Sequence, residues 1–193
     1  MSSKKRKEDI EYTDYIEKAI NGNQEAFSIL IHSIELEMYK IARVKLNNED
    51  DVYDAMQETI ILIYKNLRKL KHKEYFKTWS TKILINECNK IYKKQVKTKN
   101  NIEIDENINV KDSNDLFSKI ENQYDFNKLL YILNSKERTI ISLFYVDNYS
   151  INEISKILKI TPGAAKTRLR RTKEKIKKFC EKNKGGQLWM IKK

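Results

Sequence analysis

Residues that make tight turns and metal sites are scarce in this sequence of 193 residues. It holds only 4 glycines and 1 proline, whereas sheet proteins and phosphate-cradling loops usually draw on more turn residues. Long helices joined by short connections are therefore the expected architecture. The 2 histidines and 2 cysteines, His32, His72, Cys88 and Cys180, include no Cys-x-x-Cys pair and no zinc-ligand spacing. We therefore expect no metal and no cofactor, and we interpret the cysteines as free thiols in a reducing compartment.

Long apolar runs are missing as well. No stretch approaches the roughly 18 apolar residues of a membrane span. The chain starts Met-Ser-Ser-Lys-Lys-Arg-Lys and continues into acidic residues without an apolar signal core. We expect a cytoplasmic protein that is not inserted into a membrane.

Positive charge, in contrast, is abundant. Lys and Arg number 39 against 27 Asp and Glu, which gives a formal charge of 39 − 27 = +12. Charged residues make up 34%, yet 40% of the chain is hydrophobic, which is enough to build cores. The length allows one ordinary domain or two small ones, at about 100 to 200 residues per domain. A polyanionic partner such as nucleic acid is the first expectation.

The charge is distributed unevenly along the chain. Residues 1–63 carry 8 basic and 13 acidic side chains, whereas residues 64–94 carry 10 basic and 2 acidic. Residues 97–122, with 4 basic and 6 acidic side chains, show no sustained helical period and are interpreted as an acidic flexible linker. Residues 123–193 carry 17 basic and 6 acidic side chains. The predicted organisation is a helical domain at 10–96, the linker at 97–122, a second helical domain at 123–180 and a basic tail at 181–193.

Apolar residues advance by three and four in the first predicted domain, as on one face of a helix. A first stretch has Phe27, Leu30, Ile31, Ile34, Met38, Ile41 and Ala42, and a second has Val52, Ala55, Met56, Thr59, Ile63, Leu67 and Leu70. A third runs from Phe76 through Trp79 to about Ile91, and Trp79 is expected in the core. These stripes can bury one another, so the fold class is predicted to be all-α.

The strongest local pattern lies at residues 134–179 and predicts three helices. Ser135 is expected to cap the first helix, which Asp147 and Asn148 end. Ser150 and Glu153 have the spacing of a capping box that starts the second helix. After a three-residue turn at 159–161, Thr161 can cap the third helix and Pro162 occupies its first position.

The third helix has one apolar and one cationic face. Ala165, Leu169, Thr172 and Ile176 share the first, while Lys166, Thr167, Arg170, Arg171 and Lys173 point outward. A short helix, a tight turn and a second helix of this kind form a helix-turn-helix, whose second helix can enter a DNA major groove. An ordinary helix pair with a solvated basic face is the alternative. A membrane-surface helix is disfavoured because the apolar face is small.

The sequence resembles a known family at these motifs. Residues 133–138, 149–155 and 161–171, which read Leu-Asn-Ser-Lys-Glu-Arg, Tyr-Ser-Ile-Asn-Glu-Ile-Ser and Thr-Pro-Gly-Ala-Ala-Lys-Thr-Arg-Leu-Arg-Arg, resemble region 4 of bacterial RNA polymerase sigma factors. Residues 51–59, Asp-Val-Tyr-Asp-Ala-Met-Gln-Glu-Thr, and 76–86, Phe-Lys-Thr-Trp-Ser-Thr-Lys-Ile-Leu-Ile-Asn, resemble parts of their region 2. The resemblance spans about residues 15–179 and fits the two-domain extracytoplasmic-function (ECF) group.

The resemblance implies a sigma factor that binds core RNA polymerase, recognises the minus-ten and minus-thirty-five promoter elements and is not itself an enzyme. An anti-sigma factor is a further candidate partner. The implied polymerase-binding residues are Asp51, Asp54, Gln57, Glu58 and Ile61. The implied minus-ten residues are Lys73, Tyr75, Lys82, Asn86, Lys90, Lys93 and Lys94. The implied minus-thirty-five residues are Gly163, Lys166, Thr167, Arg168, Arg170, Arg171 and Lys173.

The sequence departs from the family pattern at two positions. Asn134 stands where the family usually has Pro, and Lys159 stands where a turn Gly is common. A left-handed Lys159 would cost on the order of 1 kcal/mol and reshape the turn slightly.

The alternative function is a free-standing helix-turn-helix regulator with an N-terminal domain that binds a ligand or dimerises. A hydrolase is disfavoured because neither histidine has a carboxylate partner at useful spacing and no nucleophile motif appears.

Overall fold

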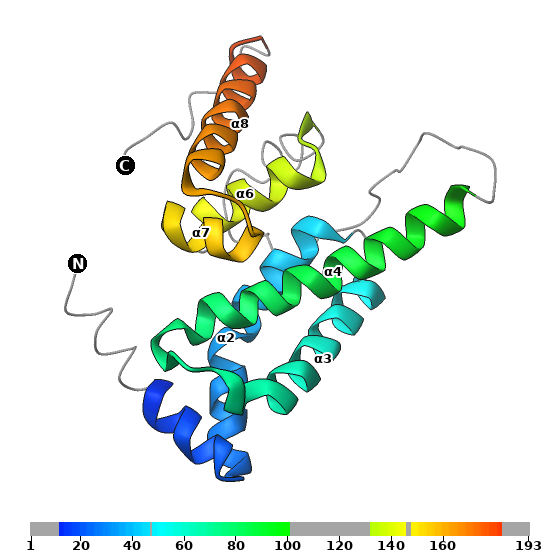
Figure 1. Cartoon of the computed structure of the whole chain (residues 1–193). Coiled ribbons are helices and arrows are strands. Elements are labelled where there is room, and N and C mark those ends of the chain that lie inside the picture. The colour runs from blue at the N-terminus through cyan, green and yellow to red at the C-terminus, as the bar shows by residue number, and fades with distance from the viewer. Residues whose placement is uncertain (1–11, 47, 101–131, 146–147, 183–193) are drawn as a thin grey trace. The chain divides into compact units, whose positions relative to one another are not determined.

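The computed structural model describes residues 12–46, 48–100, 132–145 and 148–182 (Figure 1). The regular secondary structure within these ranges consists of α- and 3-10 helices, without any strand. The all-α prediction is therefore confirmed there. The chain divides into two compact units, one containing α2, α3 and α4 and the other α6 and α8. Most of the predicted acidic linker at 97–122 and of the predicted basic tail at 181–193 lies outside the described residues, but residues 97–100 and 181–182 continue the preceding helices, α4 and α8.

Helices α2 (Gln24–Lys45), α3 (Glu49–Asn66) and α4 (Phe76–Asn100) pack against one another in the first unit. Asparagine caps start two of them: the Asn23 side chain accepts a hydrogen bond from the backbone N–H of Ala26 at 2.8 Å, and that of Asn48 from Asp50 at 3.1 Å. Acidic residues in the first turn of α3 complement the positive end of the helix dipole. Local sequence therefore fixes where these helices begin.

The predicted apolar stripes form the core of this unit. The fully or almost fully buried side chains include Leu30, Ile34, Met38, Ile41, Val52, Ala55, Ile63, Phe76, Leu84 and Cys88. Phe27 and Ile31, predicted on the same stripe, are only half-buried because they lie at its edge. Leu67 belongs to a short 3-10 helix, η1 (Leu67–Lys69), and a second, η2 (Lys73–Tyr75), leads into α4. Helix α4 continues to Asn100, four residues past the predicted domain end at 96.

The second unit contains α6 (Ser135–Tyr145), the first five residues of α7 (Ile151–Leu158) and α8 (Pro162–Lys182). Ser135 is the first residue of α6 and not its cap, so that prediction was wrong. Asn134 takes the role, because its side chain accepts from the backbone N–H of Glu137 at 3.0 Å while Glu137 accepts from the backbone N–H of Asn134 at 2.9 Å. This reciprocal pair is a capping box built on asparagine.

Candidate nucleic-acid interface

The two helices of the predicted helix-turn-helix, α7 and α8, each begin at a cap that the sequence predicted. The Ser150 backbone N–H donates to the Glu153 carboxylate at 2.8 Å, and the Glu153 backbone N–H donates to the Ser150 hydroxyl at 3.3 Å. The Thr161 hydroxyl accepts from the backbone N–H of Ala164 at 3.2 Å, directly before the first turn of α8. Both helices of the motif therefore begin at residues set by local hydrogen bonds.

Lys159 adopts the left-handed conformation that the family pattern suggests for this position, with φ at 54°. The next residue, Ile160, donates its backbone N–H to the Ser155 carbonyl at 3.0 Å and so closes the end of α7. The turn keeps its three-residue length although glycine is absent.

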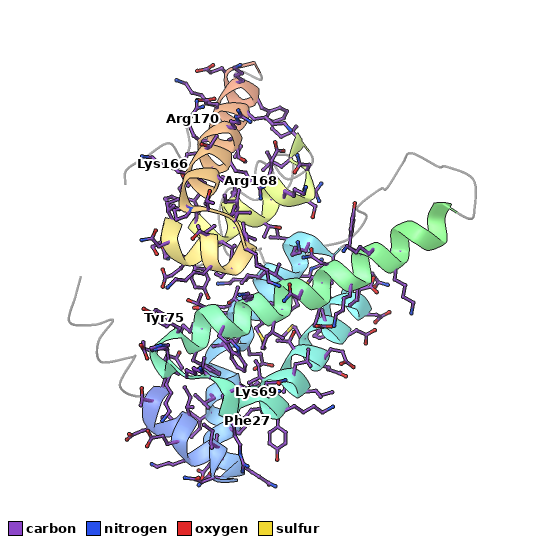
Figure 2. All side chains as sticks on the ribbon, viewed as in Figure 1. Phe27, Lys69, Tyr75, Lys166, Arg168 and Arg170 are labelled. Atoms are coloured by element: carbon purple, nitrogen blue, oxygen red, sulfur yellow. The ribbon has the colours of Figure 1, made fainter. Side chains whose placement is uncertain are left out.

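Helix α8 has the two faces that its sequence predicts. Ala165, Leu169, Thr172 and Ile176 are buried, and Lys166, Thr167, Arg170, Arg171 and Lys173 are exposed. Figure 2 shows Lys166 and Arg170 extending from one side of α8 and Arg168 from the other. Arg168 is half-buried, so this member of the predicted set presents less of its surface to a partner.

Helix α6 contacts α8 at two positions. Glu137 Oε2 accepts from Lys175 Nζ at 2.9 Å, and Lys173 Nζ lies 4.5 Å and 5.0 Å from the ring centroids of Phe144 and Tyr145. A cation at these distances over an aromatic ring is attracted to its face. Lys173 therefore has a role within the fold that the sequence did not indicate, because the ends of α6 and the middle of α8 are about 30 residues apart in the chain.

The predicted minus-ten residues differ in how available they are. Tyr75 is 42% exposed, Lys93 and Lys94 are exposed, and Lys82 and Asn86 are half-buried. Two lysines of the set are already in ion pairs within the unit.

Lys73 pairs with Glu17, and Lys90 Nζ lies 2.8 Å from Glu87 Oε1. Glu17 lies far from Lys73 in the sequence, and no spacing rule could have connected the two.

Trp79, expected in the core, is half-buried, and its ring centroid lies 6.4 Å from that of buried Phe76.

The outer face of α3 carries the predicted polymerase-binding residues. Asp54, Gln57 and Glu58 are exposed, and Ile61 is 42% exposed. Asp51 is half-buried and accepts a hydrogen bond from the Gln95 side chain, so it is less open than its neighbours.

Two exposed tyrosines, Tyr53 and Tyr64, were missed on α3. They share a side of the helix with Gln57 and Ile61, because residues 53, 57, 61 and 64 follow one another at intervals of four, four and three. That spacing was the signal in the sequence. Large exposed aromatic rings beside polar residues are typical of protein interfaces.

A polar cluster fixes the start of α3 against α2. The Tyr39 hydroxyl donates to Glu49 Oε1 at 2.8 Å, and Arg43 Nη1 lies 3.1 Å from Glu49 Oε2. Burial, together with the bond to the Glu49 carboxylate, raises the pKa of Tyr39 to about 12. The phenol is therefore a neutral donor at physiological pH, and α3 is held by its first turn.

In the described ranges each histidine lies beside a carboxylate, contrary to the expectation from the sequence: His32 Nδ1 lies 3.4 Å from Glu35 Oε2, and His72 Nδ1 lies 3.3 Å from Glu74 Oε1. No group of three or more His, Cys, Asp or Glu side chains there could hold a metal ion. Cys88 is fully buried, and burial raises the pKa of its thiol to about 12 although the positive charge of Lys45 opposes this. Among the described helices, none combines the length and apolarity needed to cross a membrane.

Comparisons with known proteins bear on both units. The chain matches the family models "Sigma-70 region 2" over residues 24–98 and "Sigma-70, region 4" over residues 126–176. It is 27% identical over 178 residues to the ECF RNA polymerase sigma factor SigW of Bacillus subtilis (strain 168), covering 84% of this chain and 93% of that one. The chain belongs to the sigma-70 family of RNA polymerase sigma factors.

Solved structures agree on the fold of this sigma factor. The structure of CnrH in complex with the cytosolic domain of CnrY has a TM-score of 0.67 at 20% identity and covers 89% of this chain and 97% of that one. The sigma factor RpoE from Bartonella quintana, in complex with the anti-sigma factor NepR, has a TM-score of 0.64 at 19% identity and covers 80% and 96%.

As an ECF sigma factor, the protein binds core RNA polymerase and promoter DNA and directs promoter-specific transcription initiation. A free-standing regulator is not favoured, because the matched families include the region 2 unit as well as the helix-turn-helix.

Proposed function

We propose that this sigma factor divides promoter recognition between its two units, with α8 reading the minus-thirty-five element and α4 with its preceding loop contacting the minus-ten element. The outer face of α3 docks on core polymerase. The observation that carries the proposal is the construction of α8, whose cations are exposed on a helix that is buried on the opposite face and capped at its start by Thr161.

The N-terminal half of α8 fits a DNA major groove. Lys166, Thr167 and Arg170 are exposed along this half, and arginine and lysine donate well to the guanine acceptors of the groove. A Cβ placed on Gly163 would meet no heavy atom within 4 Å, so the fold does not require glycine there. A glycine in the first turn lets the DNA backbone approach closely, and we assign it that role.

The contacts that the other cations of α8 make within the unit indicate which role each of them has. Arg170 is paired with Glu174 one turn on, an exposed pair of the kind that contributes little and exchanges readily for a stronger acceptor. Lys173 lies over two aromatic rings, so we assign it to holding α8 on α6 as well as to the DNA backbone. Arg168 and Arg171 are assigned to flanking phosphates.

For the minus-ten element we propose Lys73, Tyr75, Lys82, Asn86, Lys90, Lys93 and Lys94. Tyr75 has an exposed ring on which an unstacked base can stack, and the lysines of α4 supply a track for the sugar-phosphate backbone. Lys90 makes this contact only by leaving Glu87, a neighbour three residues before it.

Polymerase docking is assigned to Asp51, Asp54, Gln57, Glu58 and Ile61, with Tyr53 and Tyr64 added from the structure. The face combines carboxylates with exposed apolar and aromatic side chains, the composition of a protein interface. An anti-sigma factor is a further partner, as for the solved RpoE complex. We assign the protein to the cytoplasm and no catalytic activity of its own.

The test compares two groups of α8 variants by fluorescence anisotropy on minus-thirty-five and scrambled duplexes at several salt concentrations. Lys166→Ala should lose about 1 to 3 kcal/mol on the preferred element and relax its preference at one or two base pairs. Arg171→Ala should weaken all duplexes alike and lower the salt slope by about 1. Lys136→Ala, an exposed lysine on α6, is the matched control and should change neither.

If Lys166→Ala weakens both duplexes by the same factor, α8 is a nonspecific basic face. That result would remove the base-reading role while leaving family membership untouched.

A further inference from the structure

Residues 12–20 form a helix that lies before the part of the chain matched by the family model, which begins at residue 24. The helix ends at a turn in which Gly22, at φ 92°, donates its backbone N–H to the Ala19 carbonyl at 3.0 Å. The sequence assigned no role to this segment. The helix contacts the loop between α3 and α4, which is residues 67–75, and the start of α4.

The first contacts are polar and reach the beginning and the middle of the loop. Arg68 Nη2 donates to the backbone carbonyl of Ile20 at 3.0 Å, at the last helical residue of the segment. Lys73, in η2, forms an ion pair with Glu17. Two cations of the loop are thus held by acceptors on one short helix.

The last contact is aromatic and reaches the start of α4. The Tyr12 ring lies 5.8 Å from that of Phe76, which is 1% exposed, and Lys77 Nζ lies 5.3 Å from the Tyr12 ring centroid. The helix at 12–20 therefore contacts the start and the middle of the loop and the first residues of α4.

The bonds within the loop are local: His72 Nδ1 lies 3.3 Å from Glu74 Oε1, and the His72 ring lies 6.0 Å from that of Tyr75. The short 3-10 turns of the loop close through the backbone bonds Leu70 to Leu67 and Tyr75 to His72, both 3.1 Å. No side chain of η2 is buried. Short 3-10 turns have weak hydrogen-bond geometry, so contacts from other elements also influence where their side chains point.

We propose that the helix at residues 12–20 is a positioning element for minus-ten recognition, which holds Lys73 directly and Tyr75 through its chain neighbours Lys73 and Phe76, in the arrangement that discriminates between sequences. The inference rests on the proposed function, namely that this loop contacts the minus-ten element. Glu17 is 57% exposed and Lys73 28%, so the ion pair is too open to contribute much to folding. Its effect is therefore expected in sequence preference, with folding unchanged.

The experiment reconstitutes the full chain with core polymerase and selects bound duplexes from two pools, one randomised at the minus-ten and the other at the minus-thirty-five positions. Sequencing gives the enrichment of the best sequence over the mean. Glu17→Gln should lower minus-ten enrichment about two- to fivefold, the range that exposed ion pairs produce. The minus-thirty-five enrichment should not change.

Matched variants separate position from charge and from folding. Asp14→Asn removes a carboxylate from the same helix at an exposed site and should leave minus-ten enrichment at the parental level. Tyr12→Ala should lower it, whereas Tyr12→Phe keeps the ring and should restore it. Should Tyr12→Ala unfold, the two carboxylate variants, both at exposed positions, still decide the matter.

Tyr75→Ala shows which claim has failed if the helix variants have no effect. The positioning role is overturned alone if Tyr75→Ala lowers minus-ten enrichment while Glu17→Gln matches Asp14→Asn. Both claims are overturned if Tyr75→Ala leaves minus-ten enrichment unchanged, because the loop then does not read this element.

Discussion

Glu137 connects the beginning of α6 to the middle of α8. Burial alone would raise the pKa of its carboxyl, but the hydrogen bonds from the Asn134 backbone N–H and from Lys175 outweigh this and lower the pKa below the usual 4.5. A carboxyl with a lowered pKa in the folded state contributes stability above its unfolded pKa and loses it as the pH falls through the folded value.

We predict that Glu137→Gln destabilises the second unit by about 1 kcal/mol at pH 7, because glutamine can keep the cap hydrogen bond but loses the charge that pairs with Lys175 and with the positive end of the α6 dipole. The difference from the parent should shrink towards pH 3, because protonation removes the same charge from the parent. Urea unfolding at both pH values measures this, with Glu174→Gln, at an exposed site on α8, as control. A difference that is the same at both pH values would contradict the electrostatic explanation.

Burial lowers the reactivity of the Cys88 thiol. With the thiol pKa raised to about 12, hardly any thiolate is present near neutral pH. In a Cys180→Ser background we predict that the folded protein reacts with Ellman's reagent at pH 8 about a thousandfold more slowly than the chain unfolded in guanidinium. A rate in the folded protein close to that of a free thiol would show that Cys88 is accessible.

The elements themselves were largely predictable, because their signals are local. The capping box at Ser150 and Glu153, the start of α8 at Pro162 and the buried stripe of α8 all follow from residues within a few positions of one another. The cap of α6 was misplaced by one residue, since Asn134 and Ser135 are both good capping residues and sequence alone does not choose between them.

Lys159 offers a test of backbone strain in the helix-turn-helix. An L-residue held in the left-handed conformation destabilises the folded state by about 1 to 2 kcal/mol. Replacing it with glycine removes this strain, but the greater conformational entropy of glycine in the unfolded chain cancels about 0.5 to 1 kcal/mol of the gain in stability. We predict that Lys159→Gly is more stable than the parent by about 0.5 kcal/mol. Lys159→Ala removes the same side chain but keeps the Cβ, so it should not gain stability. Thermal unfolding compares the three, and equal gains for both variants would point to the side chain instead.

Contacts between distant parts of the chain were not predictable, and they changed the site most. Glu17 holds Lys73, and Phe144 and Tyr145 hold Lys173, although the sequence presented both lysines simply as cations for DNA. Composition and spacing find the cations of an interface. Whether a cation also stabilises the fold depends on packing between elements that are distant in the sequence, and local sequence patterns do not show this packing.

At the scale of the whole molecule, function depends on separate surfaces for polymerase and DNA. We predict that Asp54→Ala combined with Gln57→Ala weakens binding to core polymerase about tenfold, because both side chains are exposed at the centre of the α3 face. A core-binding titration measures this, with circular dichroism to confirm that helicity is kept. Glu25→Ala combined with Ser28→Ala, an exposed pair on α2, is the matched control and should bind as the parent does.

The central claim is that the two units read two promoter elements, and transcription from a randomised pool tests it most directly. Core polymerase with the full chain transcribes promoters randomised across both elements, and the templates that yield RNA are sequenced. We predict two enriched sequence blocks at a fixed separation, with Lys166→Ala relaxing only the upstream block and Asn86→Ala only the downstream one. A single block, or one that both variants relax together, would contradict the account.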